Sequence, residues 1–154
     1  MNRRMFLVPS ATLLTSLALS DAHAQTVGKQ VISSPNAPEA IGPYSQAIKS
    51  GRTVYLSGQI AIDPKTKQLT VNASIEDQTR LVLENLKAVL AADGLTMDSI
   101  VSATVFLTDL ADFAKMNEVY ATYFKNTPPA RATVEVAHLP RSAKVEISAI
   151  AVHP

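Results

Sequence analysis

The sequence predicts an α+β fold, in which two amphipathic helices cover one face of a mixed six-stranded sheet. Segments of strand and helix pattern follow one another as three strands, helix, strand, helix and two strands. Each helical segment carries a single apolar stripe, so each can cover a sheet from one side only. The opposite face of the sheet is not uniformly polar, and we expect self-association with closed cyclic symmetry to bury it.

The three strand candidates before the first helix cover residues 30–33, 45–49 and 53–62. Between the first and second, Gly42 and Pro43 fix a bend that holds Tyr44 directly after it. A glycine inside the third strand, Gly58, has two explanations. It marks either a bulge with a close backbone approach or packing against a neighbouring strand.

Two helices and one strand come next. Ser74, with Asp77 three residues later, predicts the start of a helix that runs to Asp93 and stops at Gly94. Its expected buried stripe is Ile75, Val82, Leu86, Val89 and Leu90. Residues 99–108 predict a strand, and residues 110–124 predict a second helix. That helix is expected to turn Phe113, Met116, Tyr120 and Phe124 into the core, with Asn117 beside them at a site edge or in solvent.

The stretch from Pro128 to Ile147 predicts two strands, which we interpret as a hairpin about Pro140 and Arg141. In the first strand Ala132, Val134 and Val136 form an apolar face that is expected to pack, while Arg131, Thr133 and Glu135 form a polar face.

In such a hairpin Arg131 would be roughly 16 Å from Glu146, at about 3.3 Å per residue. A small molecule could then contact both side chains only at a boundary between subunits. On sequence pattern alone, a structural ion pair of Arg131 with Glu135 or Glu146 is favoured over a role in binding a ligand.

Residues 1–24 predict a signal peptide, followed by a single domain at residues 25–154. Arg3 and Arg4 precede an interrupted apolar run, and Ala22-His23-Ala24 has the small residues of a cleavage site. The paired arginines resemble a twin-arginine signal, and the ordinary secretory route stays open. An uncleaved anchor or an unstructured tail is the alternative. We expect a periplasmic or secreted protein with no stable membrane insertion after cleavage.

Composition excludes several classes of function. The chain has no cysteine, which excludes disulfides, thiolate nucleophiles and cysteine metal sites. Removal of residues 1–24 with Arg3, Arg4 and Asp21 leaves 12 of the 14 basic and 12 of the 13 acidic residues. A neutral domain gives no electrostatic footprint for nucleic acid. His138 and His153 lie far apart in sequence, so we expect no metal site.

Several motifs match one known family. They are Ile41-Gly42-Pro43-Tyr44, Ser57-Gly58-Gln59-Ile60, Asn85-Leu86-Lys87, Thr104-Val105-Phe106-Leu107 and the closing stretch from Pro129 to Ile147. Through these motifs the chain resembles the Rid (YjgF-like) reactive intermediate deaminases, also described as enamine/imine deaminases. The resemblance covers roughly residues 31–152, nearly the whole predicted domain.

The resemblance implies a chorismate-mutase-like α+β fold and a homotrimer with sites in the clefts between subunits. It also implies hydrolysis of 2-imino or 2-amino-alkenoic acids to 2-oxo acids and ammonia without a cofactor. Arg131 would bind the substrate carboxylate, Glu146 would position water, and Tyr44 would support it. The pocket would be lined by Ser57, Gly58, Asn117 and Thr133.

The residue types suit this chemistry. A planar guanidinium can hold a carboxylate through two parallel hydrogen bonds. One carboxyl group can serve as general base and then as general acid, and no covalent nucleophile is needed. Thr133 stands where many relatives carry cysteine, so no thiol-dependent property is expected here.

Two other functions compete with catalysis. A non-catalytic trimer could bind small carboxylates or act as a holdase for unfolded proteins. Ribonuclease activity is a third hypothesis, and the neutral charge of the domain speaks against it.

Overall fold

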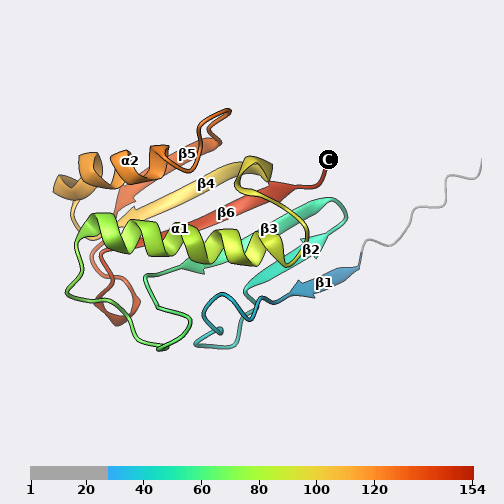
Figure 1. The fold of residues 1–154 in the computed structure, drawn as a ribbon, viewed down its shortest axis with the longest axis horizontal. Helices are drawn as coiled ribbons and strands as arrows, with labels where there is room; N and C mark the ends of the chain where they lie inside the picture. Colours follow the sequence, from blue (N-terminus) through green and yellow to red (C-terminus); the bar gives the residue numbers. More distant parts are fainter. Residues whose placement is uncertain (1–27) are drawn as a thin grey trace, which may run out of the picture.

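A computed structural model describes residues 28–154, so the predicted signal peptide lies outside the described residues. The predicted order of strands and helices is confirmed (Figure 1). The strands are β1 (Lys29–Ile32), β2 (Ala47–Ser50), β3 (Thr53–Gln59), β4 (Ile100–Leu107), β5 (Ala130–Glu135) and β6 (Val145–Val152). The α-helices are α1 (Ile75–Ala91) and α2 (Phe113–Ala121), and 3-10 turns lie at Met97–Ser99, Leu110–Asp112 and Pro140–Ser142.

The strands form one six-stranded sheet in the order β1-β2-β3-β6-β4-β5. Neighbours are antiparallel except β4 and β5, which run parallel, so the sheet is mixed. Both helices lie on the same face of the sheet (Figure 1). The predicted α+β architecture is therefore confirmed. No helix within residues 28–154 combines the length and apolar character that crossing a membrane requires.

The predicted hairpin of the last two strands is wrong. β6 lies between β3 and β4, and β5 pairs with the other side of β4. The central strand β6 buries alternate residues under the helices, whereas β5 is an edge strand with exposed side chains on both faces. Alternation of side chains is the same in a hairpin strand and in an edge strand, so the pattern cannot identify the partner strand.

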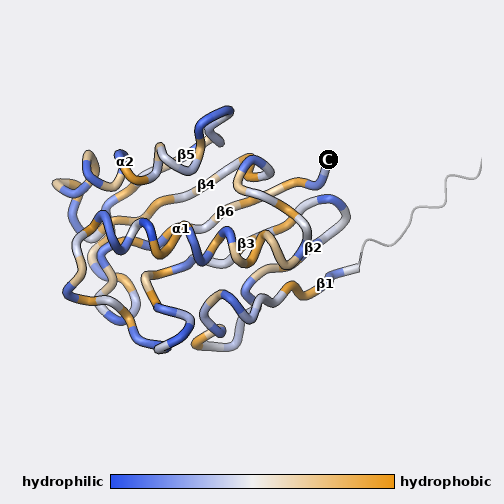
Figure 2. Tube along the Cα trace, viewed as in Figure 1, coloured by the Kyte–Doolittle hydropathy of each residue, from blue (hydrophilic) through white to orange (hydrophobic). Residues whose placement is uncertain are grey.

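The core lies between the sheet and the helices. The predicted stripe of α1 is buried, and Figure 2 shows apolar and polar residues alternating along this helix. In the second helical segment Met116, Tyr120 and Phe124 are buried, but Phe113 is exposed. Phe113 lies on the same side of the helix as the other three, but it is in the first turn of α2, where too little of the protein covers it.

The face of the sheet away from the helices is open within one chain and is partly apolar. Val31, Tyr55 and Val134 are 63%, 51% and 42% exposed on it. The expectation that Ala132 and Val134 pack is wrong for a single chain, because no element covers this side of the edge strand. Exposed apolar side chains gathered on one face are typical of an interaction surface.

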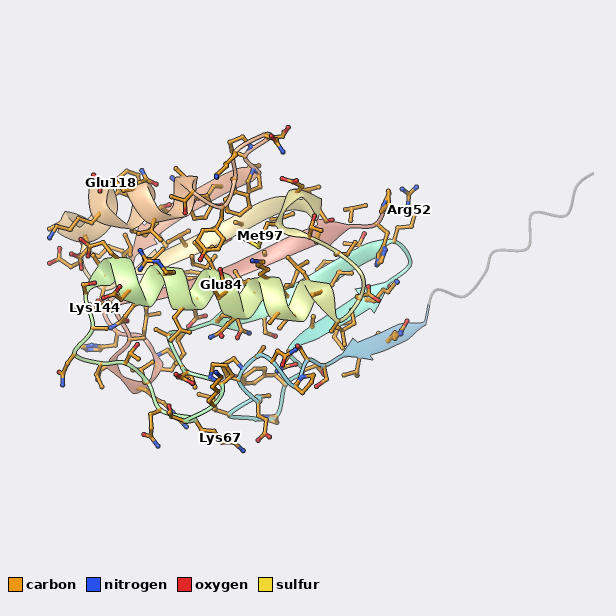
Figure 3. The ribbon with its side chains drawn as sticks, viewed as in Figure 1. Arg52, Lys67, Glu84, Met97, Glu118 and Lys144 are labelled. Atoms are coloured by element: carbon orange, nitrogen blue, oxygen red, sulfur yellow. The ribbon has the colours of Figure 1, made fainter. Side chains whose placement is uncertain are left out.

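The start of α1 is fixed to the start of β6. Ser74 caps the helix as predicted, because its Oγ accepts from the backbone N–H of Asp77 at 3.1 Å. Gln78 is fully buried, and its Oε1 accepts from the N–H of Lys144 at 3.0 Å. Lys144, which Figure 3 labels beside this end of α1, also donates its Nζ to the carbonyl of Ala73. These bonds fix the chain two residues before Glu146.

Candidate active site

A hollow of about 360 Å³ opens beside Glu146, between β3 and the loop that follows β1. Four of the seven predicted site residues line it: Tyr44, Ser57, Gly58 and Glu146. Most of the remaining wall is apolar and comes from Pro38, Ala40, Ile41, Ile60, Ile62 and Pro140. We call this space the Glu146 hollow.

β3 is bulged at Gly58, because its register with β6 shifts between Leu56 and Gln59. The bulge brings the Gly58 backbone against the Glu146 side chain. A Cβ at position 58 would collide with Oε1 of Glu146 and would lie 2.7 Å from its Cδ. Of the two explanations for Gly58, the bulge with a close approach is confirmed. Only glycine leaves room for the carboxylate over this strand.

Glu146 is half-buried on β6, and no described residue forms a hydrogen bond or ion pair with its carboxylate. Burial raises the pKa of the Glu146 carboxyl above its ordinary value. A carboxylate that is partly removed from water and left without a donor is a better proton acceptor than one on the surface. This group can therefore act as a base towards a molecule in the hollow.

Tyr44 and Ser57 complete the polar side of the Glu146 hollow. The Tyr44 hydroxyl accepts from the N–H of Ile41 at 3.2 Å, which leaves its own proton available. Ser57 donates its Oγ proton to the carbonyl of Ser45 at 2.7 Å, so its position is fixed. The predicted bend at Gly42 and Pro43 is present, and Tyr44 directly after it lines the hollow.

Two buried amides hold the walls of this hollow, and sequence reasoning missed both. Gln46 donates to the carbonyl of Pro38 at 2.7 Å and accepts from the N–H of Ser34 at 2.6 Å. Asn85 of α1 donates to the carbonyl of Ile62 at 2.9 Å. Their partners lie between 8 and 23 residues away, so the sequence around them carries no signal for this role.

Arg131 lies elsewhere, on β5 at the sheet edge. It lines a second hollow of about 470 Å³ together with Asn117, Tyr120, Ala121, Phe124, Pro128 and Pro129, which we call the Arg131 hollow. Its guanidinium lies 4.5 Å from the centroid of the Tyr120 ring and 5.9 Å from that of Phe113. Within residues 28–154 no carboxylate pairs with it, and Glu135 instead accepts from the N–H of Leu110.

Two hydroxyls near Arg131 are buried without a hydrogen-bond partner, those of Tyr120 and Thr133. Thr133 follows Arg131 on the same side of β5, but it lines neither hollow. The Tyr120 hydroxyl lies close enough to Arg131 for the guanidinium to influence its pKa.

Arg131 and Glu146 lie on opposite faces of the sheet. Arg131 is opposite Ala103 of β4, and Glu146 is opposite Phe106 of the same strand. Residues three apart in a strand point to opposite faces, so the two side chains cannot meet within one chain. The hairpin from which we predicted that one chain cannot bring Arg131 and Glu146 together is wrong, but the observed register leads to the same conclusion by another route.

No three or more histidine, cysteine or acidic side chains gather in residues 28–154 so as to hold a metal ion. His138 is exposed, whereas His153 lies against Asp93 with Nε2 2.5 Å from Oδ2. Lys49 approaches the same carboxylate at 3.2 Å. This cluster joins β2, the segment after α1 and the segment after β6, and none of its three residues lines either hollow.

Comparison with known proteins decides the family. A family model described as Endoribonuclease L-PSP matches residues 34–153. The chain belongs to the Rid (YjgF-like) family. A RutC family protein of Pyrococcus horikoshii is 55% identical over 123 residues, which are 80% of this chain and 97% of that protein. The 2-iminobutanoate/2-iminopropanoate deaminase of Mus musculus is 48% identical over 124 residues, 80% of this chain and 91% of that enzyme.

Solved structures of Rid relatives have the same fold. The structure of Escherichia coli TdcF with bound serine is 47% identical and superposes with a TM-score of 0.78, covering 81% of this chain and 98% of TdcF. The predicted Rid residues of this chain thus form two groups in one subunit. Tyr44, Ser57, Gly58 and Glu146 share one hollow, while Arg131 and Asn117 share the other.

Proposed function

We propose that this chain is a hydrolytic deaminase that converts 2-imino and 2-amino-alkenoic acids into 2-oxo acids and ammonia. The observation that carries the proposal is the half-buried Glu146 carboxylate, which lies beside an open hollow without a partner. Such a group suits proton transfer to and from water. The name of the mouse relative, 2-iminobutanoate/2-iminopropanoate deaminase, supports this substrate class.

Arg131 supplies the group that binds the substrate carboxylate. Its guanidinium has no carboxylate partner in residues 28–154, so its charge and its paired N–H donors are available to a ligand. The Thr133 hydroxyl lies on the same side of β5, but it is buried and lines neither hollow, so we assign it no contact with the carboxylate. Asn117 adds an amide at the edge of the Arg131 hollow.

The reaction needs one proton carrier and no cofactor. Glu146 takes a proton from water as the oxygen adds to C2 of the imine, and it passes this proton to the nitrogen. Glu146 then takes the proton of the new hydroxyl, the C2–N bond breaks, and the nitrogen leaves with that proton as ammonia. An enamine substrate first takes a proton at C3 to become the imine. Tyr44 supports the water through its free hydroxyl proton.

We further propose a homotrimer whose clefts each combine Arg131 of one subunit with Glu146 of the next. In this arrangement one substrate could contact both side chains, although they lie on opposite faces of the sheet within each subunit. The exposed apolar side chains Val31, Tyr55 and Val134 on the open face supply a surface for such contacts. Closed cyclic symmetry would cover this surface in every subunit. Light scattering should give the mass of three chains.

Ammonia release from 2-iminobutanoate, generated in the assay by an amino-acid oxidase, tests the function. Glu146→Gln should lower kcat by about 10²–10⁴-fold, because the proton carrier is lost. Arg131→Ala should raise KM strongly while the trimer persists. Arg52→Ala is the matched control, since Arg52 binds the carbonyl of His153 away from both hollows (labelled in Figure 3). Full activity of Arg131→Ala would eliminate the proposed site.

The same variants separate the deaminase from a holdase or a passive carboxylate-binding trimer. Suppression of aggregation that survives Arg131→Ala, in a protein that releases no ammonia, would favour a holdase. Binding of 2-oxobutanoate without ammonia release would favour a binding protein.

We also propose that the protein is exported and acts in the periplasm or outside the cell. Arg3, Arg4, the apolar run and Ala22-His23-Ala24 support this proposal. Cleavage should leave Gln25 as the first residue of the exported protein, which N-terminal sequencing would detect. Retention of Met1 in a protein that stays in the cytoplasm would contradict export.

A further inference from the structure

Tyr120 has a role that its place in the hydrophobic core does not explain. Its side chain is 5% exposed, yet its hydroxyl is buried without a hydrogen-bond partner. The guanidinium of Arg131 lies 4.5 Å from the centre of its ring, within the range of a cation–π contact.

An aromatic ring, and not a carboxylate, supports the exposed guanidinium of Arg131. Ion pairing would hold it more firmly, but a carboxylate partner would occupy the N–H donors that a substrate needs. An aromatic face attracts the cation without neutralising it and leaves both edges of the guanidinium plane open. The Tyr120 ring is itself fixed, because it stacks on Phe124 with centroids 4.5 Å apart and an interplanar angle of 30°.

We propose that Tyr120 is a positioning residue, whose ring holds the Arg131 guanidinium in place for a substrate carboxylate. The inference rests on the proposed function of Arg131 and deepens it. Burial raises the pKa of the Tyr120 hydroxyl, and the positive charge of Arg131 lowers that pKa by a smaller amount. The hydroxyl therefore lies close to the guanidinium. Because arginine only donates hydrogen bonds, this hydroxyl can accept one when the guanidinium turns towards a ligand.

Three variants measure the contribution of the ring. The readouts are the Kd for 2-oxobutanoate by calorimetry and kcat at saturating imine. Tyr120→Leu should weaken 2-oxobutanoate binding by about tenfold and change kcat much less, because a carboxylate anchor binds substrate and transition state alike. Tyr120→Phe keeps the ring and should stay within about threefold of the wild type. Tyr120→Met fills the core with a flexible side chain and should behave as Tyr120→Leu.

Tyr123→Leu is the matched control. This tyrosine lies three residues further along, and its hydroxyl donates to Glu84 at 2.8 Å on the outer side of the helices. Tyr123→Leu removes the same atoms as Tyr120→Leu but leaves the contacts of Arg131 unchanged, so the Kd for 2-oxobutanoate should not change. Thermal unfolding of all variants identifies any that lose binding because they lose the fold.

A double-mutant cycle distinguishes positioning from general packing. In an Arg131→Ala background Tyr120→Leu should have no further effect on the Kd, because there is no guanidinium left to hold. An undiminished effect in that background would overturn the inference, and so would an unchanged Kd in folded Tyr120→Leu and Tyr120→Met. If Arg131→Ala alone leaves the Kd unchanged, the proposed function fails instead.

Discussion

Glu146 is the residue on which the proposed chemistry depends, and its environment sets the proton affinity of its carboxyl group. Burial raises the pKa of this carboxyl, and no donor among residues 28–154 stabilises its charged form. A free glutamate, with its ordinary pKa of 4.5, would be a weaker base. The half-buried position on β6 thus favours proton uptake from water nearer to neutral pH.

The pH dependence of the rate follows from this shift. Because the pKa of Glu146 is raised, its carboxylate form and hence kcat should be lost as pH falls through a value above 4.5. The acid limb should be absent in Glu146→Gln. A wild-type kcat that stays constant down to pH 4.5 would contradict the assignment.

The raised pKa of Glu146 also makes the free energy of unfolding depend on pH: the carboxylate form that favours catalysis destabilises the folded state. A raised pKa in the folded state means that folding disfavours the charged carboxylate. Glu146→Gln should therefore be more stable than the wild type above the folded pKa, and this difference should shrink as pH falls through it. Thermal unfolding at several pH values measures both quantities on the same samples.

Among the elements, the bulge of β3 has the most direct influence on the site. It lets the strand backbone approach Glu146 so closely that a methyl group at position 58 has no room. Overpacking of this kind costs about 1–3 kcal/mol or displaces the neighbouring side chain. Either outcome moves the carboxylate away from the water that it has to activate.

Gly58→Ala should lower kcat at least tenfold, on the order expected for a misplaced general base. Gly28→Ala is the control, because a Cβ at Gly28 meets no atom within 4 Å. Ammonia release and thermal unfolding of both variants check the prediction. A Gly58→Ala enzyme with wild-type kcat would show that the close approach has no functional importance.

Most elements could be predicted from the sequence because their signals are local. Ser74 caps α1 through a bond to Asp77, and the alternation of β6 places Val145 and Ile147 under the helices. The pairing of β5 could not be predicted, because it depends on a partner strand more than twenty residues earlier. The buried amides Gln46 and Asn85 were missed for the same physical reason.

At the scale of the whole molecule, the site residues divide between two hollows on opposite faces of the sheet. The resemblance to the family named Tyr44, Ser57, Gly58 and Glu146 of one hollow and Arg131 and Asn117 of the other, but Arg131 and Glu146 were expected in a hairpin that does not exist. The role of Tyr120 was hidden, because an aromatic residue in a helix stripe has the same pattern whether it packs alone or holds a guanidinium. The open, partly apolar face of the sheet is the surface on which we propose that subunits meet, so that each cleft contains residues of both hollows.

Activity of a mixed assembly tests the shared site most directly. At a substrate concentration far below the raised KM of Arg131→Ala, this variant and Glu146→Gln should each release almost no ammonia. Equal amounts of the two chains are then mixed, unfolded and refolded together. If each cleft takes Arg131 from one subunit and Glu146 from the next, about one quarter of the clefts contain both native residues, and ammonia release should recover to about one quarter of the wild-type rate. A mixture that assembles but stays as inactive as its two components would contradict a site shared between subunits.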